Sequence, residues 1–135
     1  METTIIRRMH VVAMLVGPIG GVTDMVAAEF ERGRVEVVRV AHAAAACERL
    51  AVAMPQVVVV LGTLLADERE AIADRATAVG AAVMYFDPEL DQDTLEELVA
   101  AAARTAIERK LRRDQSAPAG SLPETQDGDD VDGNW

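Results

Sequence analysis

Aromatic residues and cysteine are scarce in this chain of 135 residues. The aromatic side chains are Phe30, Tyr85, Phe86 and Trp135. A hydrophobic core therefore has to be built from aliphatic and alanine side chains. Because Cys47 is the single cysteine, a disulfide within the chain is excluded, and we expect a reducing compartment and a cytoplasmic protein.

Long hydrophobic runs and an excess of positive charge are also lacking. No run approaches the ~18 apolar residues that a membrane helix needs, so we expect no membrane partner. The net charge is −10, and residues 114–135 hold six acidic residues but no Lys or Arg. This leaves 17 acidic against 13 basic residues in 1–113, which argues against a nucleic-acid partner. The sequence predicts one domain over residues 1–113 and a disordered acidic tail over 114–135, where apolar residues are almost absent.

The most informative apolar run is Val57–Leu61, which lies between Pro55 and Gly62. A run of five aliphatic residues without alternation predicts a strand that is buried on both faces, in the middle of a parallel sheet. Three more strands are predicted at Val11–Val16, Val35–Val40 and Ala81–Phe86. The second of these is predicted at a sheet edge, because Glu36 and Arg39 interrupt it.

Helical patterns separate the predicted strands and follow the last one. The predicted helices run from the N-cap Thr23 to Gly33, from Ala41 to Met54, from Asp67 to Gly80, and from Asp93 or Thr94 to Arg113. The third helix is expected to open with a capping-box-like pair, Asp67 and Glu70. Strands that alternate with helices predict a parallel sheet with right-handed crossovers and a helical layer on each face.

From about residue 11 to residue 110 this order resembles the receiver domain of response regulators. In that family an apolar strand ends near Thr or Ser, a helix ends in Ala-Gly-Ala, and a strand ends in Lys-Pro. The corresponding features here are Thr63, the run Ala78–Ala82, and Asp87-Pro88. The resemblance implies a three-layer α/β sandwich of the receiver or flavodoxin type, with a parallel sheet of four or five strands.

The acidic residues that a receiver uses are missing from their expected places. Receivers hold Mg²⁺ with an acidic pair after the first strand and take phosphate on an Asp at the end of the third, because the cation needs clustered oxygen ligands. Here no acid follows the first strand before Asp24, none follows the central strand before Asp67, and Asp87 replaces the Lys. His10 and His42 have no second ligand at metal spacing.

We therefore expect a degenerate receiver, or pseudo-receiver, that is not an enzyme and uses no metal and no cofactor. The predicted function is a non-catalytic, phosphorylation-independent protein-interaction module in bacterial-type signalling or regulation. Two surfaces are candidates for binding a protein partner. The final helix is longer than its sheet requires, so that Ile107 and Leu111 are expected to extend beyond the sheet, where they could join a homodimer. Trp135, in the polar tail, is the other candidate anchor.

The alternative prediction is a small-ligand or nucleotide sensor. The loop Gly17-Pro18-Ile19-Gly20-Gly21 lies between a strand and a helix, where α/β folds cradle phosphates with backbone N–H groups. It lacks the Gly-Lys-Ser/Thr of a P-loop and does not match the dinucleotide fingerprint. The candidate ligand residues are Gly17, Gly20, Gly21, Thr63 and Asp87.

Overall fold

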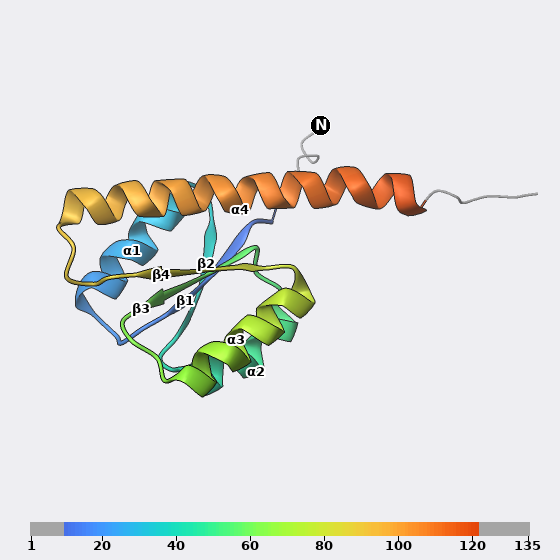
Figure 1. The fold of residues 1–135 in the computed structure, drawn as a ribbon. Coiled ribbons are helices and arrows are strands. Elements are labelled where there is room, and N and C mark those ends of the chain that lie inside the picture. The colour runs from blue at the N-terminus through green and yellow to red at the C-terminus, as the bar shows by residue number, and fades with distance from the viewer. Residues whose placement is uncertain (1–9, 122–135) are drawn as a thin grey trace, which may run out of the picture.

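Strands and helices alternate along the chain in the computed structural model, which describes residues 10–121 and their side chains as far as residue 113 (Figure 1). The elements are β1 (Val12–Val16), α1 (Gly21–Arg32), β2 (Glu36–Val40), α2 (Ala43–Ala53), β3 (Val57–Leu61), α3 (Ala66–Val79), β4 (Ala82–Phe86) and α4 (Gln92–Ser121). Each predicted strand is present, with bounds that differ by one residue at most from those predicted.

The four strands form one parallel sheet in the order β2-β1-β3-β4. All five residues of β3 are buried, and β3 pairs with β1 on one side and β4 on the other. The prediction of a central strand that is buried on both faces is therefore confirmed. The prediction that the Glu36 strand lies at an edge is also confirmed, and both Glu36 and Arg39 are exposed there.

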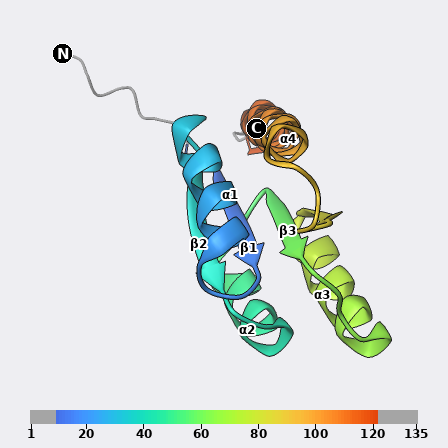
Figure 2. The ribbon, with the colours of Figure 1, turned by 90° about the vertical axis from the view of Figure 1, so that its left-hand side faces the viewer.

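Helices cover both faces of the sheet, so the predicted three-layer α/β sandwich is confirmed (Figure 2). Successive strand residues point to opposite faces, and the core is accordingly divided into two clusters. The cluster beneath α1 and α4 includes Leu15, Phe30, Val59 and Leu95. The cluster beneath α2 and α3 includes Met14, Leu50, Val58 and Ile72. The sheet has four strands in the described part of the chain, in the order of the first four strands of flavodoxin-like folds.

All four helices start one to three residues away from their predicted starts, and α2 begins at Ala43 rather than Ala41. Gly20, not Thr23, is the N-cap of α1, and Thr23 lies buried in the first turn. The start of α3 is Ala66, and the carboxylate of Glu68, not that of Glu70, accepts a hydrogen bond from the Leu65 N–H at 2.9 Å. The capping pattern is thus present in α3, but it begins earlier than the sequence suggests.

The final helix is longer than predicted at both ends. It begins at Gln92, where the Asp91 carboxylate caps it by accepting hydrogen bonds from the N–H and the hydroxyl of Thr94, and it ends at Ser121 rather than Arg113. Thirty residues at 1.5 Å each give a length of about 45 Å. Figure 1 shows α4 running well past the sheet. Residues 122–135, which include the rest of the predicted acidic tail and Trp135, lie outside the described part of the chain. Among the described helices, none combines the length and the apolar character needed to cross a membrane.

Candidate functional site

The carboxyl edge of the sheet contains a topological switch point between β1 and β3. These two strands are neighbours, but the helices that follow them, α1 and α3, lie on opposite faces of the sheet. The loops leaving β1 and β3 therefore diverge and leave a crevice, which is where ligands bind in open α/β sheets. The crevice is bordered by residues 17–20 after β1 and residues 62–65 after β3.

Two glycines shape the β1–α1 loop. Gly17 is buried, and its N–H donates a hydrogen bond to the Val40 carbonyl at 3.0 Å. A Cβ at this position would lie 3.2 Å from both the Thr23 hydroxyl oxygen and the Leu61 Cβ, so glycine allows the loop to pass close to the end of β3. Gly20 has a φ of +93° and a ψ of 179°, a backbone region that is essentially restricted to glycine. This sharp turn starts α1.

A cavity of about 430 Å³ lies in the crevice, on the side of α1. Its lining includes Gly20, Thr23, Leu61, Thr63 and Pro88, and none of the described residues that line it is charged. Thr23 is only 3% exposed, and its hydroxyl makes no side-chain hydrogen bond within the described residues. The cavity is therefore mainly apolar and contains one buried hydroxyl that has no protein partner there.

Thr63 also lines two neighbouring cavities. One, of about 260 Å³, lies on the α2 and α3 side and includes Gly17 and His42. The other, of about 480 Å³, includes Tyr85 and Asp87 at the end of β4. The structure thus places Gly17, Gly20, Thr63 and Asp87 along one edge of the sheet, as the sequence suggested. Gly21, the remaining candidate ligand residue, lines none of these three cavities.

The three aspartates that the sequence analysis compared with a receiver site each serve local structure. Asp24, in the first turn of α1, forms an exposed ion pair with Arg39. Asp67 accepts a hydrogen bond from the Glu68 N–H at 3.0 Å, and Asp87 accepts one from the Glu89 N–H at 2.9 Å. In the described part of the chain, no group of three or more His, Cys, Asp and Glu side chains could hold a metal ion.

Two exposed aliphatic residues at this edge were missed by the sequence analysis. Ile19 is 91% exposed on the β1–α1 loop, and Leu65 is 68% exposed on the β3–α3 loop. The sequence does indicate that both residues lie in loops, because Ile19 is within a turn-forming Gly-Pro-Ile-Gly stretch and Leu65 lies beyond Gly62, the glycine that follows β3.

His42, which lines a cavity at the same edge, has a structural role. Its Nδ1 accepts a hydrogen bond from the Ala45 N–H and caps α2.

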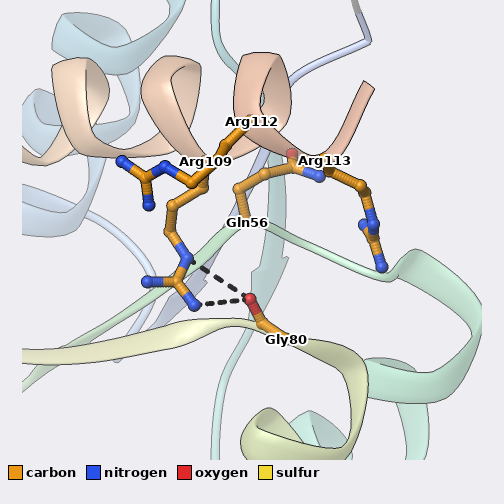
Figure 3. A pocket seen from close by; sticks show the side chains of 5 residues that line it. All are labelled: Gln56, Gly80, Arg109, Arg112 and Arg113. Atoms are coloured by element: carbon orange, nitrogen blue, oxygen red, sulfur yellow. Dashed lines mark hydrogen bonds between the residues drawn. The ribbon is translucent and has the colours of Figure 1, made fainter. Parts of the chain in front are cut away.

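At the opposite, amino edge of the sheet, basic side chains from α4 border a cleft of about 290 Å³ (Figure 3). The lining residues are Gln56, Gly80, Arg109, Arg112 and Arg113. No local sequence pattern connects these arginines with α3. Figure 3 shows Arg109 reaching from α4 to Gly80, in the turn that follows α3, with Arg113 farther along α4. There they donate hydrogen bonds to the carbonyls of Gly80 and Val79.

The two predicted interface residues of the final helix differ in exposure. Ile107 is half-buried and packs against the core cluster beneath α1 and α4. Leu111, one turn farther along, is 44% exposed. The expectation that both extend beyond the sheet is therefore wrong for Ile107. Only Leu111 keeps the exposure that such an interface requires.

Comparisons with known proteins identify the fold and nothing finer. The chain matches no protein-family model, and its sequence matches no curated protein. A de novo designed Rossmann fold protein is similar in structure, with a TM-score of 0.52 and 16% identity over 70% of this chain and 98% of the design. A GDP-L-fucose synthetase from Naegleria fowleri, solved bound to NADP, gives a TM-score of 0.46 and 12% identity. The match covers 93% of this chain but only half of the length of the synthetase. Neither protein is a receiver domain, and the resemblance to receivers stays a prediction.

Proposed function

We propose that this chain is a non-catalytic, phosphorylation-independent interaction module, of the kind used in bacterial-type signalling or regulation, that binds a protein partner through the carboxyl edge of its sheet. The observation that carries the proposal is the exposure of Ile19 and Leu65, at 91% and 68%. These side chains belong to the loops that follow two adjacent strands, so they project from the same edge.

Apolar anchors of this kind suit a protein surface. Full burial of an Ile or Leu side chain is worth about 1.5–3 kcal/mol, so two anchors supply a substantial part of a moderate binding free energy. Binding energy in protein interfaces is usually concentrated in a few such buried side chains. On its α1 side the crevice is lined, among the described residues, by uncharged groups such as Pro18 and Thr63, which favours an apolar segment of the partner there. Its α2 and α3 side also includes His42 and Glu68.

The alternative function, a small-ligand sensor, is favoured by the cavity on the α1 side of the crevice. Its volume of about 430 Å³ is within the range that small-molecule sites occupy. The buried Thr23 hydroxyl provides a hydrogen-bond donor or acceptor inside an otherwise apolar lining. An uncharged ligand with one polar group fits this lining better than a nucleotide, because none of the described lining residues is a cation that could bind phosphates.

The main proposal is tested by affinity capture with the full chain and the variants Ile19→Asp and Leu65→Asp. Val52→Asp is the matched control, because Val52 is 85% exposed at the end of α2, toward the amino edge of the sheet. We expect a specific partner to be retained by wild type and Val52→Asp, and to be lost with the other two variants. The proposal is contradicted if Ile19→Asp and Leu65→Asp still capture the partner, or if Val52→Asp loses the partner to the same extent as they do.

The sensor alternative predicts a different result. A ligand that binds only the native state raises the melting temperature. If this alternative holds, one compound of a metabolite panel raises the melting temperature of wild type by several degrees but has little effect on Thr23→Val, while Ile19→Asp responds as wild type does. No response to any compound contradicts it.

A homodimer through α4 is a further proposal about partners. Leu111 is the exposed apolar residue that supports it. Light scattering on wild type and Leu111→Glu tests this proposal. A dimeric mass for wild type and a monomeric mass for the variant support the dimer, whereas monomeric masses for both contradict it.

A further inference from the structure

We propose a second binding site, for a phosphoryl-bearing anion, in the cleft between α4 and the end of α3 at the amino edge of the sheet (Figure 3). It lies at the opposite edge from the proposed partner surface, so the two sites can be tested separately. The argument depends on the local charge, on the hydrogen-bond donors that remain available, and on one buried amide.

The cleft is strongly basic in a chain that is acidic overall. The net charge of the chain is −10, yet five of its 13 basic residues lie within residues 104–113, with Glu108 as the one acid among them. Three of the five, Arg109, Arg112 and Arg113, line the cleft, and none of the described residues that line it is acidic. Guanidinium groups stay protonated at all physiological pH values, so the positive charge of the cleft is permanent.

The structural roles of these arginines leave most of their donors available. Arg109 uses Nε and Nη2 for the Gly80 carbonyl, at 3.3 and 2.8 Å, and Arg113 uses one Nη2 for the Val79 carbonyl at 3.4 Å. Each guanidinium has five N–H donors. Arg112 is exposed and makes no hydrogen bond or ion pair within the described residues. Capping of α3 therefore accounts for only part of this cluster.

A buried amide provides the second, independent observation. Gln56 is only 5% exposed, and its Oε1 accepts a hydrogen bond from the Val12 N–H at 2.8 Å. Its Nε2 makes no hydrogen bond within the described part of the chain, although Gln56 lines the cleft. Buried polar groups are nearly always paired, so this donor calls for an acceptor in the cleft. An anionic oxygen meets that requirement and also neutralises the guanidinium charge.

The size of the cleft and its donors select the chemistry of the ligand. A volume of about 290 Å³ is small for a drug-sized molecule but sufficient for a phosphate or a diphosphate. Guanidinium groups bind phosphoryl oxygens through paired N–H donors, and three of them favour a multivalent anion over a single carboxylate. The phosphoryl group could belong to a free compound or to a phosphorylated side chain of another protein.

The test is calorimetric titration of the full chain at low salt with pyrophosphate, with a phosphoserine peptide and with acetate. Arg112→Gln removes a lining residue that has no structural hydrogen bond in the described chain, and Arg104→Gln removes the same charge from an exposed site on the same helix outside the cleft. We expect pyrophosphate to bind and Arg112→Gln to weaken it about tenfold, as expected for one lost charged hydrogen bond. Arg104→Gln should weaken it far less. The side-chain amide resonance of Gln56 should shift when pyrophosphate is added.

Each arm has a defined meaning. Pyrophosphate binding assigns the site to free phosphoryl compounds, and binding of the phosphoserine peptide alone assigns it to a phosphorylated protein. The proposal is overturned if neither binds at millimolar concentration, or if acetate binds as tightly as they do. An equal loss of affinity with Arg104→Gln and Arg112→Gln also overturns it, because diffuse helix charge would then explain the binding.

Discussion

The guanidinium of Arg109, on α4, donates two hydrogen bonds to the carbonyl oxygen of Gly80, the C-cap residue of α3. The carbonyls at the end of a helix lack intrahelical partners and carry partial negative charge, so a cation is favoured there. Because α3 and α4 cover opposite faces of the sheet, this contact connects the two helical layers across the amino edge.

We predict that Arg109→Gln lowers the free energy of unfolding by about 1 kcal/mol, which is less than a buried charged hydrogen bond contributes because the site is partly solvated. Urea unfolding provides the measurement. Arg104→Gln, which removes the same charge from an exposed position of α4, should leave the midpoint nearly unchanged. Equal effects of the two substitutions would mean that the contact with Gly80 contributes nothing of its own.

The conformation of Gly20 predicts a backbone effect on stability. Its φ of +93° with ψ near 180° is essentially closed to other residues, and such strain costs about 1–3 kcal/mol. A Cβ at Gly20 would meet no heavy atom within 4 Å, so the cost of Gly20→Ala is purely conformational. Gly33→Ala is the control, because Gly33 has a φ of −86° and room for a Cβ. We expect Gly20→Ala to lower the melting temperature clearly and Gly33→Ala to leave it almost unchanged; similar shifts would contradict this.

The sheet could be predicted from the sequence because its signal is local. The unbroken apolar run Val57–Leu61 indicates that both faces of β3 are covered, and the charged residues Glu36 and Arg39 indicate that β2 lies at an edge of the sheet. The helix starts were less predictable, because several residues compete for each cap. Thr23 is a good N-cap by type, but the unusual φ of Gly20 starts the helix three residues earlier, and a glycine permits such a dihedral angle without requiring it.

The site could be predicted only in part, for a related reason. Gly17, Gly20 and Thr63 were located correctly because each follows a strand, and the ends of parallel strands share one edge. The exposure of Ile19 and Leu65 carries no periodic signal, since loop residues do not alternate. The arginines were visible at helical spacing, but Gly80 lies 29 residues before Arg109, and only the packing of α4 brings them together.

The cap of α4 leads to a prediction about pH. The hydroxyl and the N–H of Thr94 donate hydrogen bonds to the Asp91 carboxylate and hold the pKa of Asp91 below its usual value of 3.8. A lowered folded-state pKa means that this stabilisation is complete above the usual value and is lost as the pH falls toward the folded-state value. Thr94→Val removes the hydroxyl, the larger contribution, and should raise the pKa of Asp91. Titration of the Asp91 carboxyl carbon by NMR measures this, and an unchanged pKa would exclude the hydroxyl as its cause.

The separate roles of Asp24, Asp67 and Asp87 predict that the chain does not accept a phosphoryl group. Asp24 is paired with Arg39, while Asp67 and Asp87 each accept a hydrogen bond from a backbone N–H in their own loop or turn. A phosphorylation site of the receiver type requires clustered carboxylates around Mg²⁺, and these three do not form a cluster that could hold a metal.

We therefore expect incubation with acetyl phosphate and Mg²⁺ to leave the intact mass of the chain unchanged. A phosphorylatable receiver domain treated in the same way is the positive control, and the acid lability of its adduct distinguishes an acyl phosphate from a phosphoester. Arg39→Gln is the informative variant, because it releases Asp24 from its ion pair. It should stay unmodified as well, since one released carboxylate still lacks the neighbouring acids that would hold Mg²⁺ beside it. An acid-labile adduct on wild type would show that these aspartates gather in solution, and it would replace the interaction module with an active phosphorylation switch.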